Sequence, residues 1–479
     1  MAIKVLLVYP NFRWIPGFET KTLWNVHPYN LGLIASMIES EHEVSILDAN
    51  MEKLSKEEFF DRIKENNPDV VGISVLTNEY GDAAIIAADI VKKVNQKIKT
   101  IVGGVHATSN PHVVIKNPNV NYVISGEGEY VFKDLCNFFD GKKELPENGI
   151  VYKKDGEIID TGRASFIHDL DALPLPAYHL VDFAKYANEI QRESVDRPRD
   201  IPYARILTSR GCPFNCCFCE VETISGKKPR VRSPEHIIKE IEWLKEKYGI
   251  KALIFDDDNL FIYKDRAKKL LQLMIDKKLN LKWNAIAVAI FKLDEELVEL
   301  MKESGCQYID VAIESGVERV LKDIIHKPLD LDYARHMIKK IKELDIDLAA
   351  NFVIGFPGET WNEIRQTIKF AEEIDVDYTK IFIATPLPNT ELYRIAKEKG
   401  YLRKDFDFNK HLWTDGAITT PEFRPVDLKI LRSYEWDRIN FSKENKRKKV
   451  AQMMGITEER LNEIRKTTLA RANPGDING

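Results

Sequence analysis

Short apolar runs alternate with amphipathic segments over the first 145 residues. The runs at 3–9, 43–47, 69–76, 99–102 and 121–124 predict strands, and the segments at 31–40, 59–66, 82–94 and 129–139 predict helices. Strands separated in this way by helices form parallel sheets that are covered on both faces. We therefore expect a doubly wound, Rossmann-like α/β domain over 1–145, whose ligands bind beyond the carboxyl ends of the strands.

A second α/β pattern with longer units follows a connector at 146–202. The connector holds a hairpin pattern at 149–152 and 157–160 and then a segment with Pro174 and Pro176 that lacks periodicity. Six strand patterns follow, at 204–209, 252–256, 282–287, 308–313, 348–354 and 378–384, with helix patterns at 234–247, 265–277, 294–304, 317–325, 333–344 and 360–373. Six units are fewer than the eight of a closed barrel. We expect a (β/α)6 partial TIM barrel over 203–395 and a helical capping region over 396–479.

Composition excludes several classes of protein. A chain of 479 residues with 44% hydrophobic and 30% charged residues can build more than one core. The formal net charge of -5 argues against a dedicated nucleic-acid binder, which carries a basic excess. Apolar runs are too short for a membrane span, and the first strand pattern is too short for a signal peptide. We therefore expect a cytoplasmic protein with no membrane span and no nucleic-acid partner.

The cysteines are unevenly spread. Cys212, Cys216, Cys217 and Cys219 lie within eight residues, directly after the first barrel strand, whereas a disulfide framework would spread them. Structural zinc usually takes two separated pairs of ligands, and no second pair follows; three thiolates on an iron–sulfur cubane would leave one iron open for a substrate. A zinc knuckle remains the alternative. We interpret Cys217 as a bystander or a stray ligand.

The C-x3-C-x2-C loop of Cys212, Cys216 and Cys219, placed after strand one of a partial barrel, resembles the radical S-adenosylmethionine (SAM) superfamily. The resemblance implies that these three residues hold a [4Fe-4S] cluster and that the strand ends bind SAM. It assigns Phe218 and Ile354 to the adenine and Glu314 and Ser315 to the ribose or carboxylate. Two further SAM contacts, on strands two and three, complete the set: Asp257 and Asn284. The alternative for the acidic run 256–258 is a solvated loop that caps a helix.

The glycine-rich strand ends of the first domain are similar to the cobalamin-binding half of cobalamin-dependent radical SAM enzymes. They do not match a dinucleotide fingerprint after the first strand. The resemblance covers residues 1–395 approximately and implies these cobalamin contacts: Ser74, Leu76, Thr77, Gly103, Gly104, His106, Ala107, Thr108, Gly126, Glu127, Gly128 and Glu129.

One departure concerns the metal of that cofactor. Many such domains carry D-x-H-x-x-G after the second strand, but Asp48 here is followed by Ala49, Asn50 and Met51. We therefore expect no protein histidine on cobalt and a lower face turned to the loop at 74–78. His106 is expected to hydrogen-bond the corrin periphery or its own loop.

The resemblance implies a methyltransferase that acts on an unactivated carbon, or on a phosphinate, through a 5′-deoxyadenosyl radical and methylcobalamin. Non-methylating ring closure or rearrangement with the same cofactors is the first alternative, and a non-catalytic cobalamin and iron–sulfur redox sensor is the second. A methylthiotransferase fits poorly, because the first domain lacks a second cysteine set.

The expected partners are a small-molecule substrate and a flavodoxin or ferredoxin-type electron donor. Aromatic and basic residues of the last 85 residues could touch the substrate or could simply pack and be solvated: Trp413, Arg432, Tyr434, Trp436 and Arg438. Arg432 and Arg438 could equally indicate an anionic substrate or only pair with Glu435 on one helix.

Overall fold

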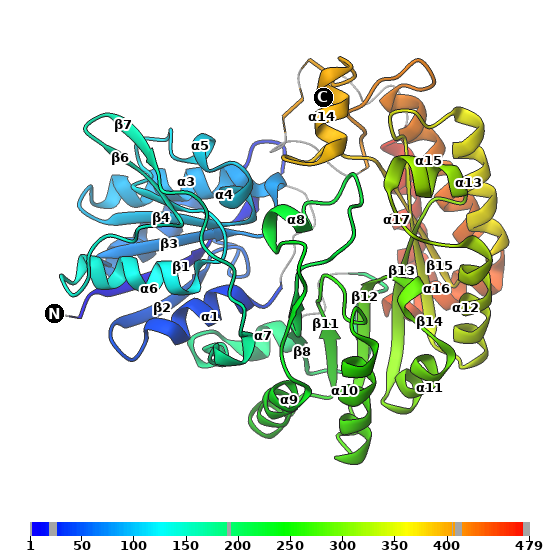
Figure 1. The fold of residues 1–479 in the computed structure, drawn as a ribbon, viewed down its shortest axis with the longest axis horizontal. Helices are drawn as coiled ribbons and strands as arrows, with labels where there is room; N and C mark the ends of the chain where they lie inside the picture. The colour runs from blue at the N-terminus through cyan, green and yellow to red at the C-terminus, as the bar shows by residue number, and fades with distance from the viewer. Residues whose placement is uncertain (1, 19–25, 189–192, 405, 408–413, 473–479) are drawn as a thin grey trace. The chain divides into compact units, whose positions relative to one another are not determined.

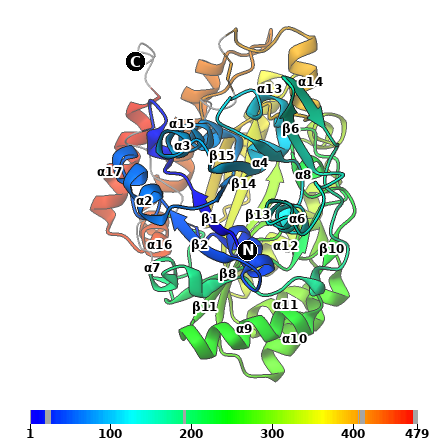
Figure 2. The same cartoon turned by 90° about the vertical axis from the view of Figure 1, so that its left-hand side faces the viewer.

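The computed structural model describes residues 2–18, 26–188, 193–404, 406–407 and 414–472. Its contacts divide the chain into two units, one of residues 1–192 with 223–226 and one of residues 193–222 with 227–479. Figures 1 and 2 show the two α/β units, each built around its own sheet. Each unit is described by itself below.

The first unit is built on a seven-stranded sheet of order β2-β1-β3-β4-β5-β6-β7. The first five strands are parallel; β6 pairs antiparallel with β5, and β7 pairs antiparallel with β6. The hairpin that the sequence placed in the connector therefore extends this sheet. The strands are β1 (Lys4–Tyr9), β2 (Glu43–Asp48), β3 (Val70–Val75), β4 (Lys99–Gly104), β5 (Tyr122–Ile124), β6 (Ile150–Lys154) and β7 (Glu157–Asp160).

Helices cover both faces of the parallel strands. The order β2-β1-β3-β4-β5 is that of a doubly wound fold, in which consecutive crossovers change face where the strand order reverses. α1 packs on α6, and α2 packs on α3 (Figures 1 and 2). The helices are α1 (Tyr29–Ile38), α2 (Lys56–Asn66), α3 (Gly81–Val94), α4 (Val105–Ser109), α5 (Pro111–Val114), α6 (Gly128–Phe139) and α7 (Phe183–Ala187).

The second unit holds a six-stranded, all-parallel sheet of order β15-β14-β13-β12-β11-β8. Each of these strands lies beside the next one in sequence, which is the order of an open (β/α)6 barrel. The strands are β8 (Tyr203–Ile206), β11 (Ala252–Phe255), β12 (Lys282–Val288), β13 (Cys306–Glu314), β14 (Asp347–Ile354) and β15 (Tyr378–Ile383); β9 (Ser209–Arg210) and β10 (Arg230–Val231) form a separate antiparallel pair.

Capping signals in the sequence set the helix ends of this unit. Ser233 accepts a hydrogen bond from the backbone of His236 at the start of α9, and Gly249 ends that helix in the left-handed region. Thr360 and Glu363 form a capping box on α13. The helices are α8 (Val221–Ile224), α9 (Pro234–Tyr248), α10 (Lys264–Asp276), α11 (Glu295–Glu303), α12 (Leu331–Glu343), α13 (Trp361–Glu373), α14 (Glu391–Glu398), α15 (Pro425–Phe441), α16 (Glu444–Met454) and α17 (Glu458–Ala470).

The helix expected at 317–325 differs from the prediction. It is a π-helix, η6 (Val320–Ile325), and it ends at His326 in the left-handed region. A π-helix carries one extra residue per turn and is common at functional sites. Its last carbonyl, that of Ile325, accepts a hydrogen bond of 3.0 Å from the backbone N–H of Cys217. The irregular turn therefore serves the cysteine loop.

Helix α15 covers the edge strand β15. Side chains at 432, 436 and 440 follow one face of the helix at a spacing of four residues. Arg432 donates to the carbonyl of Ile381 at 2.8 Å. Asn440 accepts from the backbone N–H of Thr379 at 2.7 Å and donates to its carbonyl at 2.8 Å. An amide side chain thus takes the hydrogen bonds that a seventh strand would make.

Candidate functional site

The three cysteines of the predicted cluster lie on one half-buried loop after β9. Burial raises the pKa of Cys216 to about 11 and that of Cys219 to about 12, and it also raises the pKa of Cys212. The thiols also lie near enough to raise one another's pKa values. Within the described residues, no three side chains of metal-ligating type meet around a single ion. A cubane binds one thiolate per iron, so these three soft donors fit it without meeting at one point.

The acidic run after β11 is hydrogen-bonded to the segment that leads into the cysteine loop. Asp257 accepts from the backbone N–H of Thr208 at 3.1 Å and from its hydroxyl at 2.7 Å, and Asp258 accepts from the N–H of Gly211 at 2.7 Å. Asp256 forms a two-pronged pair with Arg205. The alternative of a solvated, helix-capping loop does not describe this run, because each of the three carboxylates is engaged by barrel backbone or by arginine.

Asp257 keeps one oxygen for another partner. Its Oδ2 is buried and has no hydrogen-bond partner in the described part of the chain. Burial raises the pKa of this carboxyl to about 6, against the opposing hydrogen bonds from Ser209 and Thr208. A buried acceptor without a partner is costly, so a ligand donor at this point would stabilise it. The contact of Asp257 with SAM stays a prediction.

Cys217 holds the loop through its backbone. Its N–H donates to Ile325, and its carbonyl accepts from Leu392 at 2.8 Å. Its thiol is buried, and burial raises its pKa well above the ordinary value. The next residue, Phe218, lies against the ring of Phe356 after β14, with ring centroids 5.8 Å apart. Cys217 anchors the loop to two elements, and Phe218 reaches the strand end that was expected to line the adenine.

The end of β13 carries a buried ion pair. Glu314 accepts from the ammonium of Lys327 at 3.0 Å, and both side chains are less than one-tenth exposed. The φ of Glu314 is 71°, a left-handed conformation that is uncommon for a residue with a side chain. Ser315 shares a hydrogen bond of 3.0 Å with Thr367 of α13. Lys327 also lowers the pKa of Cys212 and Cys216, so its charge lies near the cluster loop.

Lys327 was missed at the sequence level. It stands 13 residues after Glu314, beyond the π-helix, so no local pattern joins the two. The pair Lys327 and Pro328 offered a weak signal, because a residue that precedes a proline has a restricted backbone. The structure brings this cation to the predicted SAM residues.

Glu359 closes the turn after β14. Its Oε2 accepts from the N–H groups of Gly355 at 2.7 Å and Phe356 at 3.0 Å, which fixes the backbone that follows Ile354. Burial raises the pKa of Glu359 from 4.5 to about 7, and the two N–H groups oppose that shift. The folded chain therefore holds this proton over a range in which the unfolded chain has lost it, so this residue makes stability fall as pH rises from 4.5 to about 7.

Asn284 lies within β12, below the strand ends. Its Nδ2 donates to the carbonyl of Asp196 at 3.0 Å, and its buried Oδ1 has no partner in the part of the chain that the structure describes. In the pairing of β11 with β12 it is level with Ile254, three residues before Asp257.

The predicted cobalamin residues gather at the carboxyl ends of β3, β4 and β5. Ser74 accepts from Asn30 at 3.1 Å, and Thr108 accepts from the N–H of Gly126 at 3.0 Å. A Cβ on Gly104, whose φ is +90°, would lie 2.5 Å from the carbonyl of Val75. The glycine therefore allows the ends of β3 and β4 to meet closely.

The remaining members of that set divide between the strand ends and the local scaffold. Glu127 accepts from the N–H of Ile167 at 2.6 Å, which ties its loop to the connector. Ala107 and Glu129 are buried, and Leu76 packs against the core. Strand β4 and helices α4 and α6 hold the others: Gly103, His106 and Gly128. Thr77 precedes a 3-10 turn at 78–80 and has a buried hydroxyl.

His106 belongs to its own loop. Its Nδ1 lies 3.2 Å from Oδ1 of Asn78, and its ring lies against Gly81, where a Cβ would meet it at 2.6 Å. At the end of β2, Asp48 accepts from the hydroxyl of Tyr186 at 2.7 Å and from the N–H of Met51 at 2.8 Å. Burial raises the pKa of Asp48 to about 6. The local hydrogen bond of His106 was one of the two roles expected for it.

Of the C-terminal candidates, Trp413 lies outside the described residues. Arg438 forms ion pairs of 2.6 Å with Glu372 and 2.7 Å with Glu435, as the pairing alternative predicted. Tyr434 is 51% exposed. Trp436 is buried and donates to the hydroxyl of Tyr378 at 3.0 Å. Among the candidates that the structure describes, Arg432 and Trp436 reach a barrel strand.

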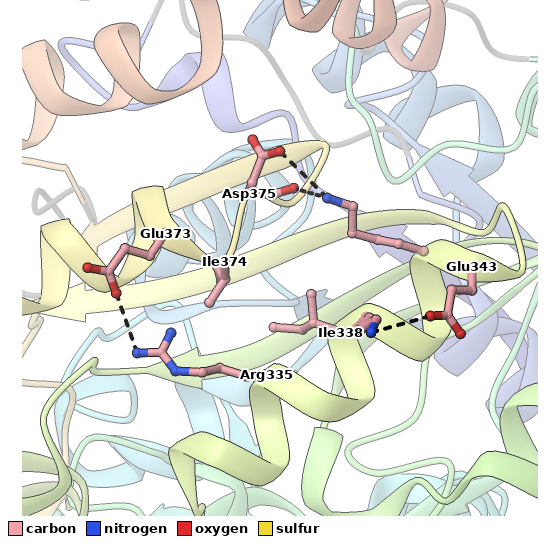
Figure 3. A pocket seen from close by; sticks show the side chains of 8 residues that line it. Arg335, Ile338, Glu343, Glu373, Ile374 and Asp375 are labelled. Atoms are coloured by element: carbon pink, nitrogen blue, oxygen red, sulfur yellow. Dashed lines mark hydrogen bonds and ion pairs between the residues drawn. The ribbon is translucent and has the colours of Figure 1, made fainter.

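A separate pocket of about 550 Å³ lies on the outer side of the second unit, between α12 and the end of α13 (Figure 3). Arg335 lies 3.4 Å from Glu373, and Lys342 lies 3.7 Å from Asp375. In these two ion pairs, charged side chains that line the pocket pair with one another. None of the predicted site residues lines it.

Two family models match the chain. The Radical SAM superfamily matches residues 206–371, and the B12 binding domain matches residues 21–136. The first range contains the cysteine loop and the four middle strands of the barrel, from β11 to β14. The second contains all twelve predicted cobalamin contacts. No helix among the described residues has the length and apolar character needed to cross a membrane.

Curated relatives cover nearly the whole chain. An uncharacterized methyltransferase of Pyrococcus horikoshii is 34% identical, over 90% of this chain and 91% of the relative. The cytidylyl-2-hydroxyethylphosphonate methyltransferase of Streptomyces wedmorensis is 30% identical, over 87% and 86%. An anaerobic magnesium-protoporphyrin IX monomethyl ester cyclase of Rubrivivax gelatinosus is 27% identical, over 88% and 74%.

Solved structures share the fold. The cobalamin-dependent SAM radical enzyme OxsB has a TM-score of 0.73 at 16% identity, over 98% of this chain and 72% of that one. The radical SAM methyltransferase TsrM of Kitasatospora setae, solved with cobalamin and a [4Fe-4S] cluster, has a TM-score of 0.67 at 19% identity, over 84% and 76%. The expected α/β architecture, with its partial barrel and helical C-terminal segment, is confirmed.

Proposed function

The chain belongs to the cobalamin-dependent radical SAM methyltransferase family, with a [4Fe-4S] cluster, SAM and cobalamin as its cofactors, and on that premise we propose that it methylates an unactivated carbon, or a phosphinate, of a small molecule. The observation that carries the proposal is the loop with three desolvated thiols, which opens a barrel preceded by a B12 binding domain. Two relatives named as methyltransferases, each covering more than four-fifths of the chain, support methyl transfer.

The residues are assigned roles within this proposal. Cys212, Cys216 and Cys219 hold the cluster. The proposed SAM contacts are Phe218, Asp257, Asn284, Glu314, Ser315 and Ile354. The proposed cobalamin contacts are Ser74, Leu76, Thr77, Gly103, Gly104, His106, Ala107, Thr108, Gly126, Glu127, Gly128 and Glu129. The proposed domains are 1–145, 146–202, 203–395 and 396–479.

When bound, the three cofactors supply one-electron cleavage of SAM and a transferable methyl group. The chain itself supplies position and exclusion of water. Asp257 and Asp258 accept hydrogen bonds from the backbone that precedes Cys212, and Cys217 anchors the loop itself through its own backbone N–H and carbonyl. Glu359 fixes the turn after β14 that carries Phe356, and the ring of Phe356 contacts Phe218. A reacting centre held by such backbone contacts gains from orientation rather than from side-chain chemistry.

Anaerobic reconstitution with iron, sulfide and hydroxocobalamin tests the proposal. The reconstituted chain is incubated with a reductant, SAM and a metabolite extract, and the products of SAM are analysed. Methyl transfer gives S-adenosylhomocysteine together with 5′-deoxyadenosine. Deoxyadenosine and methionine without S-adenosylhomocysteine would contradict methyl transfer and favour ring closure or rearrangement, which the cyclase relative supports as a second candidate. A cluster without turnover would favour a redox sensor.

We also propose an electron donor of flavodoxin or ferredoxin type and a cytoplasmic location. Both proposals rest on the thiol chemistry, since the cluster needs electrons and its cysteines must stay reduced. Reduction of the reconstituted cluster by such a donor, followed by its visible absorbance, tests the first. A donor that leaves the absorbance unchanged would contradict it.

A further inference from the structure

The inner face of the barrel is polar on its last three strands. Phe352 of β14 packs on Phe370 of α13, with ring centroids 6.3 Å apart, so the alternate residue Asn351 faces the interior. Ala312, Asn351 and Lys380 are in register across β13, β14 and β15. All three are partly exposed, whereas their neighbours along each strand are buried. This row therefore borders space that solvent reaches from inside the barrel.

Lys380 carries a charge into this row. Its ammonium binds Asp310, which also accepts from the amide of Asn351. Burial lowers the pKa of Lys380, but attraction to Asp310 and Asp196 outweighs it, and the pKa is raised. The group therefore stays an ammonium, with 18% of its side chain exposed. Of its three N–H donors, one binds Asp310, and no acceptor for the other two is recorded in the described residues.

Tyr378 adds a second donor on the same face, two residues earlier. Its oxygen accepts from the indole N–H of Trp436 at 3.0 Å, which leaves its own O–H proton to donate. Arg432, one turn before Trp436 on α15, affects the pKa of Tyr378 and so lies near it. Strand β15 and helix α15 thus present an ammonium, a hydroxyl and a guanidinium together.

We propose that Tyr378 and Lys380 bind an oxyanion of the methyl acceptor, a carboxylate or a phosphoryl group, and so determine which acceptor is used. The inference deepens the proposed function and rests on it. Lys380 is in register with Asn351, three residues before Ile354, so the oxyanion lies roughly 10 Å below the strand end. That depth separates it from the strand-end SAM contacts. Trp436 is a positioning residue, because it acts through Tyr378.

The charge balance supports an oxyanion over a cation. Asp310 accepts from Asn351, Lys380 and, at 3.4 Å, from the hydroxyl of Tyr308, so this carboxylate is already engaged. Asp196, the other carboxylate that attracts Lys380, accepts from the hydroxyl of Ser194. The groups with open valence on β15 are donors, and Oδ1 of Asn351, a buried acceptor without a partner in the described residues, is uncharged. Oxygen atoms of a charged acceptor form the stronger, charge-assisted hydrogen bonds with such donors.

Methyl-labelled SAM identifies the acceptor. The holoenzyme is incubated with a metabolite extract, and the labelled product is passed over an anion exchanger at pH 8 and analysed by mass spectrometry. We expect retention, and the formula distinguishes carboxylate from phosphoryl. A labelled product that is not retained would overturn the inference and leave the proposed function standing. No labelled product at all would count against the proposed function.

Variants assign the subsite to residues. For the purified acceptor, Lys380→Met and Tyr378→Phe should raise KM by about tenfold or more, whereas Lys339→Met on the exposed face of α12 and Tyr434→Phe should not. Trp436→Phe should raise KM with little change in kcat. Unchanged KM in both subsite variants would overturn the inference.

A binding measurement is independent of turnover. Titration of the holoenzyme with inorganic phosphate or with citrate should give a saturable change in tryptophan fluorescence. The change should persist in Lys339→Met and should be lost in Lys380→Met. Equal responses in these two variants would contradict binding at Lys380.

Discussion

Replacement of Asn440 by leucine should open the edge of the barrel. Asn440 is fully buried and holds both the N–H and the carbonyl of Thr379, at 2.7 and 2.8 Å. Leucine has a similar volume but no polar atoms, so both backbone groups of β15 would lose their partner. An unsatisfied buried group costs about 1–3 kcal/mol, and two such groups cost about 2–6 kcal/mol.

Hydrogen exchange measures this loss locally, which matters in a chain of two units. At about 1.4 kcal/mol per factor of ten, a loss of about 2 kcal/mol speeds exchange of the β15 amides by roughly 30-fold. The matched control is Asn462→Leu on the exposed side of α17, which should leave β15 unchanged, and β1 serves as an internal reference. Equal protection of β15 in Asn440→Leu and in the parent chain would refute the role given to this amide.

Three further outcomes are expected. Cys217→Ala should keep the iron and sulfide content of the reconstituted chain, whereas Cys216→Ala should lose the cluster; loss of iron in both would show that Cys217 is a ligand. In the parent chain the unfolding free energy should fall by about 3 kcal/mol between pH 4.5 and about 7, and Glu359→Gln should remove that fall. Urea titration at each pH measures the unfolding free energy. If the fall persists in the variant, a group other than Glu359 causes it. Gly81→Ala should destabilise the first unit by about 1–3 kcal/mol, because the new methyl group meets the ring of His106 at 2.6 Å. Adding His106→Ala should restore the thermal midpoint, and no restoration would place the strain elsewhere.

The sequence predicted the two sheets well, because apolar strand runs follow a local rule. The run at 378–384 and the observed β15 differ by one residue. The cysteine loop was found in the same way, since its three thiols lie close together in sequence. Such features depend on spacing along the chain and not on contacts that form when the chain folds.

The contacts among Asp310, Asn351 and Lys380 could not be found from spacing alone. These residues stand on three strands, and the folded sheet is what brings their side chains into hydrogen-bond contact. The run from Tyr378 to Ile383 places three residues with polar atoms before three apolar ones, so its sequence shows no strand alternation. The alternate burial of its side chains appears in the structure alone.

The cover on β15 has a consequence for the order of synthesis. A ribosome finishes the six strands of the barrel some forty residues before it reaches the start of α15. Until that helix folds back, the nascent chain displays a bare row of amides and carbonyls, which is the kind of surface that recruits the same strand from a neighbouring polypeptide. Truncation ahead of Pro425 should therefore yield inclusion bodies or edge-paired dimers rather than a smaller working barrel.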